Sequence, residues 1–309
     1  MHKSHYGLLL RRPFPLRILS AMLQPDFRII ALDVDGTLLD TSGRVSPAFM
    51  EAIERLARRG VHTVLCTGRR WRTAFQVVVQ IRHAHPVVVC CGGALIKEAD
   101  GHRTLYRNLL GSAAAQRTVA AFRRGGLVPF LLLDRPLSDC ELLISELDRA
   151  RASRLPYILA NPDGIQYYSG EYPELQEDPV EVYTVDHLSR VRPCEGAARA
   201  ELGDEAIVTA LLQRRYGPDQ FALEVHCPTA TKWNALRWLL RQWNFGPEQV
   251  IAIGDDVNDI PMLRGAGMSF AMGNAPPQVQ AAAARITASN DQDGVVAALR
   301  SVFPDALGR

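Results

Sequence analysis

Two aspartates directly follow the most strand-like segment of the chain, within RIIALDVDGTLLD (residues 28–40). Asp33 and Asp35 come at the end of its apolar run, and a second acidic group that includes Asp255 and Asp259 follows another apolar run. Carboxylates gathered at one point repel one another unless a cation neutralises them, and an all-oxygen set suits Mg²⁺. A carboxylate beside a metal-bound phosphate can act as a nucleophile and form an aspartyl-phosphate.

A hydroxyl and a lysine are expected at the same place. Thr67 and Gly68 follow a second apolar run, and Lys232 stands beside a predicted strand-to-helix junction. A positive charge and a donor at this edge would suit a phosphoryl group held against the metal. Taken singly, Thr67 could only cap the next helix and Lys232 could be a surface residue.

The first acidic segment could also be a calcium loop or a plain turn. An EF-hand loop beginning at Asp33 would place Thr37, Leu38 and Arg44 at positions five, six and twelve, where a ligand, glycine and glutamate are required. The spacing therefore excludes a calcium loop. A plain Asp-Gly turn is possible for either cluster alone, but it does not account for two clusters that follow two strands.

Composition indicates an ordinary globular protein. The chain has 309 residues, 47% hydrophobic and 22% charged, with a net charge of +2. Nothing in this balance favours binding to nucleic acid or to a membrane. Six cysteines form no CxxC pair, which suits reduced core thiols in a cytosolic protein, although the neighbours Cys90 and Cys91 leave a redox role open. Residues 1–26 are interpreted as a loose extension, and a start near Met22 would remove most of it.

Short β-branched runs alternate with amphipathic stretches at both ends of the chain, a pattern typical of βα units around a parallel sheet. The first block is expected to hold strands at 28–34, 61–66 and 86–91 and helices at 46–59 and 69–81. The last block is expected to hold a helix at 231–243, strands at 249–254 and 267–272, and helices after Asn258, Pro277 and Gln292, with Ala281–Ala284 in helix.

The pattern changes between residues 94 and 223, which we interpret as an inserted domain. A hairpin over 94–107 is expected to turn at Asp100 and Gly101. A strand near 140–145 and a helix near 206–216 are also expected.

The set DVDGTLLD, LCTGRR, TKWNAL and GDDVNDIPML, followed by MGNAPPQVQAAA and TASNDQDGVVAAL, resembles the haloacid dehalogenase-like phosphatases. It is most similar to their Cof-type subclass, in which an α/β cap is inserted between the second and third motifs. This resemblance implies an α/β fold: a Rossmann-like parallel-sheet core over 27–93 and 224–309, and a cap over 94–223.

The resemblance also implies roles for individual residues. Asp33 would be the nucleophile and Asp35 the general acid. Mg²⁺ would be held by Asp33, the main-chain carbonyl of Asp35, and Asp255. The phosphoryl group would contact residues of three segments: Thr67, Gly68, Lys232 and Asn258.

Three further residues would support this site. Asp259 would orient Lys232 or a metal-bound water. Gly36 would allow a sharp turn of the backbone around the phosphate, and Gly254 would shape the loop before Asp255.

Two positions depart from the family pattern. Gly92 stands where an asparagine is frequent, and Trp233 stands where a glycine usually follows the motif lysine. Both departures concern the placement of the substrate more than the nucleophile or the metal.

The function expected is Mg²⁺-dependent hydrolysis of a small phosphorylated metabolite, for example a sugar phosphate, in the cytoplasm. Alternatives are a phosphosugar mutase or phosphotransferase on the same fold, and a non-catalytic regulator that binds a phosphometabolite. Asp134, Arg135 and Tyr167 are candidate cap contacts to the substrate, each with an ordinary loop role as the alternative. The sequence predicts neither the physiological substrate nor the oligomeric state.

Overall fold

The computed structural model describes residues 26–81, 84–99, 103–135, 140–170, 172 and 177–308. The interpretation of residues 1–26 as a loose extension, the alternative start at Met22 and the turn at Asp100 and Gly101 therefore lie outside the described residues, Asp26 excepted. In the described part of the chain, no helix combines the length and apolar character needed to cross a membrane.

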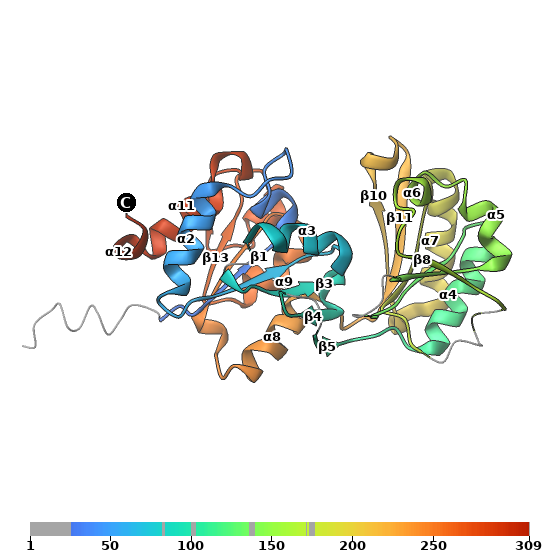
Figure 1. Ribbon diagram of the computed structural model, residues 1–309, viewed down its shortest axis with the longest axis horizontal. Coiled ribbons are helices and arrows are strands. Elements are labelled where there is room, and N and C mark those ends of the chain that lie inside the picture. The colour runs from blue at the N-terminus through green and yellow to red at the C-terminus, as the bar shows by residue number, and fades with distance from the viewer. Residues whose placement is uncertain are drawn as a thin grey trace, which may run out of the picture.

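The chain forms two lobes, each built on its own sheet (Figure 1). The first sheet has the strand order β14-β13-β12-β1-β2-β3-β4-β5, and all neighbouring strands pair in parallel except β3–β4 and β4–β5, which pair antiparallel. In that order the strands are Arg285–Ile286, Met268–Ala271, Val250–Gly254, Ile29–Leu32, His62–Cys66, Val87–Cys90, Leu95–Lys97 and Thr104–Arg107.

Helices cover both faces of this sheet, so the first lobe has three layers. One face packs against α2 (Pro47–Ala57), α3 (Trp71–Ile81) and α11 (Gly294–Val302), with α12 (Pro304–Leu307) beside them. The other face packs against α8 (Lys232–Gln242), α9 (Ile260–Gly265) and α10 (Pro277–Gln280). Because both faces are buried, strands such as Ile29–Leu32 are apolar at every position.

The second lobe holds a six-stranded sheet of order β10-β11-β9-β6-β7-β8, antiparallel except for the pair β7–β8. In that order the strands are Ile207–Leu212, Gln220–His226, Glu181–His187, Phe130–Leu132, Leu142–Ser145 and Ile165–Tyr168. Two helices, α4 (Ser112–Arg124) and α7 (Leu188–Leu202), cover its outer face. The shorter α5 (Arg149–Ala152) and α6 (Pro156–Ala160) contribute to the cluster on its other face.

The predicted α/β class and the parallel-rich sheet are confirmed. The predicted helix near 206–216 is wrong, because Ile207–Leu212 is a strand that pairs with β11 over six residue pairs. The predicted helix over Ala281–Ala284 is also wrong: α10 ends at Gln280, and the chain turns to place β14 beside β13.

The sheet topology suggests a later start for the inserted domain than the predicted residue 94. The hairpin strands β4 and β5 extend the first sheet and not the second. We therefore propose that the inserted domain begins near Asn108 and ends after His226. The two connections meet there, where the Asn108 amide donates a hydrogen bond to the Thr229 hydroxyl (2.9 Å).

Candidate active site

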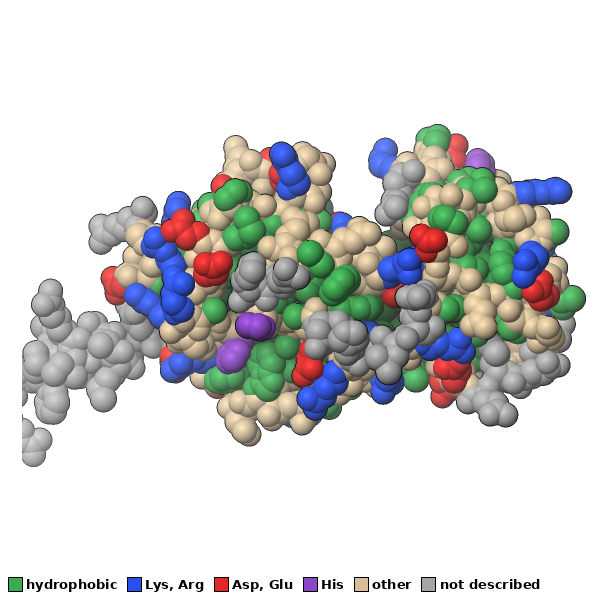
Figure 2. All heavy atoms as spheres, viewed as in Figure 1, with side chains coloured by type: hydrophobic (Ala, Val, Ile, Leu, Met, Phe, Trp, Pro, Cys, Tyr) green, Lys and Arg blue, Asp and Glu red, His purple; other side chains and the backbone are tan. Residues whose placement is uncertain are grey.

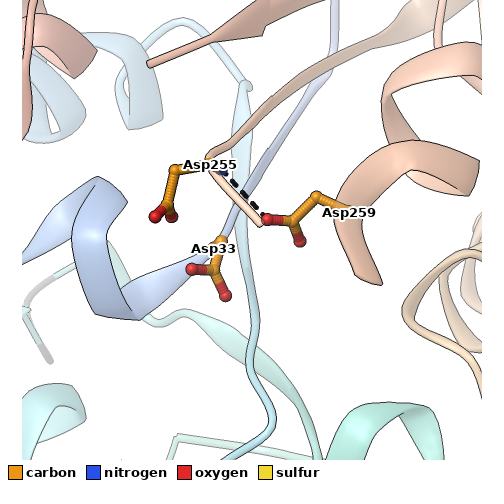
Figure 3. A group of neighbouring side chains, drawn as sticks. All are labelled: Asp33, Asp255 and Asp259. Carbon is orange, nitrogen blue, oxygen red and sulfur yellow. Dashed lines mark hydrogen bonds between the residues drawn. The ribbon is translucent and has the colours of Figure 1, made fainter. Parts of the chain in front are cut away.

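Three neighbouring parallel strands bring the acidic segments together. β1 lies between β12 and β2, so the loops after these strands meet at one edge of the sheet. Asp33 follows β1, Asp255 follows β12 and Thr67 follows β2. Asp33 and Thr67 are buried. The side chains of Asp33, Asp255 and Asp259 point toward one another (Figure 3).

Gly36 allows the loop after β1 to turn against Asp255. Its φ of +78° lies in the left-handed region, and a Cβ added there would lie 2.3 Å from Asp255 Oδ2. Gly254 has the same relation to Asp259, since an added Cβ would lie 2.6 Å from its Cγ. Both predicted glycine positions are thus places where only hydrogen fits.

Lys232 lies at the centre of the polar cluster and is 2% exposed. Thr231 caps helix α8 by accepting the Asn234 N–H, so the helix starts at Lys232. The Lys232 Nζ donates to Asp33 Oδ1 (2.6 Å), Asp259 Oδ1 (2.7 Å) and Asn258 Oδ1 (3.0 Å). Burial lowers the pKa of Lys232, but attraction to Asp33 and Asp259 outweighs burial and raises it above its usual value.

The carboxylates are not fully neutralised by this lysine. Burial raises the pKa of Asp33, with Lys232 opposing the shift and Asp259 adding to it. Burial also raises the pKa of Asp255 to about 6, although the Thr37 hydroxyl donates a hydrogen bond to it (2.7 Å). Removal of water from carboxylates that face one another thus disfavours their charged forms, and a bound cation would relieve this penalty.

The donor set fits a hard divalent cation. Asp33, Asp255 and Asp259 each offer an oxygen, and these oxygens lie within 4.8 Å of one another. Asp259 is already engaged: Oδ1 accepts from Lys232, and Oδ2 accepts the backbone N–H groups of Asp255 and Asp256. Asp33 and Asp255 are therefore the better ligands, while Asp259 holds the lysine and the loop.

The Thr67 hydroxyl accepts the backbone N–H of Arg69 (3.0 Å), but this contact belongs to the turn before the helix and is not a helix cap, because α3 begins at Trp71. Gly68 is exposed, and no atom lies within 4 Å of the position of a Cβ there. Both residues lie at the sheet edge beside Asp33, with open space above Gly68.

Asp35 does not face the cluster in this arrangement. Its carboxylate accepts two hydrogen bonds from Arg69, Nε to Oδ2 at 2.7 Å and Nη2 to Oδ1 at 2.6 Å. The Asp35 side chain is 59% exposed, whereas that of Asp33 is 6% exposed. The structure thus gives the two aspartates different environments, one buried beside a lysine and one at the mouth of the site.

Sequence reasoning gave no role to two residues that support the loop after β1. Thr37 binds Asp255, and Asn274 donates a hydrogen bond to the main-chain oxygen of Gly36 (2.8 Å). Asn274 follows β13, the strand next to β12. The sequence pattern that could have identified Asn274 is its position directly after a predicted strand of the same sheet.

The two departures from the family pattern have local causes. Trp233 lies over Gly265, where an added Cβ would be 2.2 Å from the indole ring. Gly92 is in the left-handed region, with φ of +64° and open space around it. The three candidate cap contacts have partners within the protein: Asp134 contacts Lys97 and Arg107, Arg135 contacts Glu177, and Tyr167 lies under Arg149.

The surface is hollowed between the two lobes (Figure 2). A cavity of about 240 Å³ lies there, lined from the first lobe by residues such as Trp71 and Lys97 and from the second by residues such as Asp134 and Glu141. All six cysteines are free thiols, in agreement with the expectation of reduced cysteines.

Comparisons with known proteins agree with this geometry. Residues 30–299 match the family model described as haloacid dehalogenase-like hydrolase. Phosphatase YwpJ of Bacillus subtilis is 27% identical over 87% of this chain and 97% of that protein. The chloroplastic endoribonuclease YBEY of Arabidopsis thaliana is 28% identical over 90% of this chain, which spans only 47% of that protein. A crystal structure of a haloacid dehalogenase-like hydrolase from Bacteroides thetaiotaomicron has a TM-score of 0.73 at 24% identity and covers 90% of this chain and 100% of that one.

Proposed function

Because the chain belongs to the haloacid dehalogenase-like hydrolase family, we propose that it is a Mg²⁺-dependent phosphatase that hydrolyses a small phosphorylated metabolite. A relative of nearly full length is a phosphatase, which supports a phosphoric monoester hydrolase. The observation that carries the proposal is the buried Asp33, whose carboxylate contacts Lys232 and lies beside Asp255. The free thiols support the cytoplasmic location expected from the sequence.

In the proposed reaction a carboxylate oxygen of Asp33 attacks phosphorus as the bond to the leaving oxygen breaks. Asp35 gives a proton to that oxygen, then takes a proton from the water that attacks the aspartyl-phosphate. Phosphate leaves and the Asp33 carboxylate is restored. Asp35 must turn away from Arg69 to reach the leaving oxygen.

The other residues hold the phosphoryl group and the nucleophile. Lys232 fixes Asp33 and neutralises charge, and Thr67, Gly68 and Asn258 surround the phosphoryl oxygens. Mg²⁺, held by Asp33, Asp255 and the main-chain carbonyl of Asp35, would supply charge stabilisation at those oxygens.

Phosphate release from a panel of phosphoesters, with and without Mg²⁺, tests this function. The wild type should release phosphate only with Mg²⁺, and Asp33→Asn should lose activity while retaining its fold. Asp40→Asn is the matched control, since Asp40 is also acidic and near the same loop but binds Ser42 and Arg44. Equal activity of Asp33→Asn and wild type, or activity indifferent to chelator, would refute the mechanism.

The same assay separates the alternatives. Isomerised sugar phosphate without free phosphate would indicate a mutase or phosphotransferase. Binding of a phosphometabolite with no turnover would indicate a regulator. Asp35 favours hydrolysis over regulation, because a binding protein has no need of an acid placed two residues after the nucleophile.

A further inference from the structure

One edge of the second sheet lacks the features that usually protect an edge strand. β10 (Ile207–Leu212) forms this edge and has the sequence IVTALL (Figure 1). It has six residues, whereas the other described edge strands have four (β5 and β8) and two (β14). It contains no charged residue and no proline, and it pairs with β11 in an unbroken register. Short length, charged side chains, prolines and bulges are the usual means of preventing an edge strand from pairing with another chain, and β10 has none of them.

The free edge of β10 presents backbone donors and acceptors at three residues. The Gln213 N–H donates to the Gln220 carbonyl (2.7 Å), and these two residues continue the register of the β10–β11 pair. Hydrogen-bonded pairs alternate along an antiparallel ladder, so the odd-numbered residues of β10 bond to β11. The N–H and C=O groups that point away from β11 belong to Val208, Ala210 and Leu212. These groups make no hydrogen bond to another residue within the described ranges.

Two large apolar side chains at the end of this strand are exposed. Leu211 is 40% exposed and Leu212 is 38% exposed. Val208 and Ala210 pack in the cluster that α4 and α7 cover, and alternation along a strand places Leu212 on the same face. Leu211 lies on the opposite face of the sheet. A partner strand along this edge would therefore cover one leucine on each face and also bond to the free backbone groups.

Opposite charges flank the two ends of β10. Asp204 and Glu205 precede the strand, Arg214 follows it, and all three are exposed. Glu205 pairs with Arg117 (2.6 Å), whereas neither Asp204 nor Arg214 has an ion-pair partner among the described residues. An antiparallel copy of the same strand would bring Arg214 of each copy beside the acidic end of the other. A parallel copy would place like charges together, so the charges favour antiparallel pairing with a second copy.

We propose that β10 pairs antiparallel with β10 of a second copy of this chain, about a two-fold axis at Ala210, and that the two second-lobe sheets thereby join into one. Only a register centred on Ala210 pairs the three outward-facing residues with one another: Val208 with the partner's Leu212, and Ala210 with the partner's Ala210. In this register Arg214 lies beside the partner's Asp204. The small Ala210 side chain leaves room at the axis for the two strands to approach. This inference does not depend on the proposed phosphatase function.

Sedimentation velocity over a series of protein concentrations tests the inference. One pair of edge strands makes a small interface, so the wild type should be monomeric when dilute and largely dimeric at about 10⁻⁴ M. Ala210→Pro should raise the dissociation constant of the dimer about tenfold, because it removes an outward N–H at the axis without removing a bond to β11. A wild type that stays monomeric at the higher concentration would overturn the inference.

Charge reversal tests the antiparallel orientation without changing the strand itself. Arg214→Glu and Asp204→Arg should each raise the dissociation constant about fivefold, because each places like charges together at both ends of the pair. The double variant should return to about the wild-type value, since the same pairs form with the signs exchanged. Arg300→Glu is the matched control, an exposed arginine on α11 of the first lobe. Single variants that dimerise like Arg300→Glu, or a double variant that does not recover, would overturn the proposed pairing.

Amide hydrogen exchange locates the interface. In concentrated wild type the outward N–H groups of Val208, Ala210 and Leu212 should exchange more slowly than in dilute wild type, because they become hydrogen-bonded in the dimer. The opposite edge strand, β8 (Ile165–Tyr168), is the internal control and should exchange at the same rate in both samples. A dimer whose protection falls on another surface and leaves these three amides unchanged would overturn the inference.

Discussion

Lys232 offsets the negative charge around the proposed nucleophile, and its removal would leave buried carboxylates uncompensated. We expect Lys232→Met to lower the free energy of unfolding by about 3–5 kcal/mol, the usual cost of breaking a buried ion pair from one side. Arg237→Met on the same helix is the control, because Arg237 is exposed. Urea denaturation of both variants measures the difference.

Mg²⁺ provides a second readout for the same variants. A divalent cation bound by Asp33 and Asp255 replaces part of the lost positive charge, so Mg²⁺ should stabilise Lys232→Met more than wild type. If Lys232→Met lowered the free energy of unfolding by less than about 1 kcal/mol, or by no more than Arg237→Met, Lys232 would not be the group that compensates the buried carboxylates.

The pKa of Glu181 makes stability depend on pH. An unfolded glutamate loses its proton near pH 4.5, while folded Glu181 keeps its proton up to about pH 8. Between these values the folded state binds the proton more tightly, so this residue's contribution to stability falls as pH rises. Glu181→Gln should therefore gain stability relative to wild type from pH 5 to pH 8, by roughly 1 kcal/mol per pH unit. Urea denaturation of wild type and Glu181→Gln at both pH values measures this gain, with the exposed Glu51→Gln as control. A stability difference between Glu181→Gln and wild type that is the same at pH 5 and pH 8 would contradict the prediction.

That Asp33, Asp255 and Lys232 lie together was largely predictable, because Asp33 and Asp255 follow parallel strands of one sheet and Lys232 begins a helix beside them. The sequence could not predict that Asp35 pairs with Arg69, since that contact depends on the rotamers of two exposed or half-exposed side chains. It also could not predict the inner face of the second sheet, because Glu181 and Glu224 meet only through strand register.

The loop after β1 packs against Asp255 through Gly36, and two glycines allow its role to be isolated. Gly36 and Gly43 both have φ of +78°, but only Gly36 lies against another group, Asp255. Gly43→Ala should cost about 1–2 kcal/mol of stability from backbone strain, with activity unchanged. Gly36→Ala should also displace Asp255 and lower kcat/KM about 10²-fold.

Phosphate release measures the activity of the two alanine variants, and thermal unfolding measures their stability. Equal activity of Gly36→Ala and Gly43→Ala would mean that contact between Gly36 and Asp255 does not position the site.

The central strands of the first lobe were predictable because strands buried on both faces leave a clear apolar run. The segment 206–216 was not, because its apolar residues fit either a helix or a strand. Pairing with β11 determines the outcome, and that pairing lies outside the local sequence.

At the scale of the whole molecule, a buried ion cluster joins the lobes. Asp134 of the second lobe accepts from Lys97 (2.6 Å), Arg107 (2.6 Å) and Thr104 (3.2 Å) of the first sheet. The Lys97 and Asp134 side chains are 2% and 3% exposed. Sequence reasoning placed the hairpin that carries Lys97 in the inserted domain. Its strands belong to the first sheet, and sheet membership is the basis of the later boundary that we propose near Asn108.

Another ion pair between the lobes provides the comparison. Asp163 is 83% exposed and lies 3.9 Å from Arg72. Asp134→Ala should lower the free energy of unfolding by about 3–5 kcal/mol, because it leaves the buried Lys97 without its carboxylate partner. Asp163→Ala should cost about 0–1 kcal/mol. Similar urea midpoints for the two variants would show that the buried cluster does not hold the lobes together.

In the proposed mechanism, Asp33 carries the phosphoryl group. The direct measurement is mass spectrometry of the Asp35→Asn variant, mixed with a phosphoester and Mg²⁺ and quenched in acid. Loss of the proposed acid and base should slow hydrolysis of the intermediate, so a phosphoryl group is expected on the peptide that contains Asp33 and is expected to be absent from Asp33→Asn. A phosphoryl group on another residue, or continued release of phosphate with no phosphorylated peptide, would show that Asp33 is not the nucleophile.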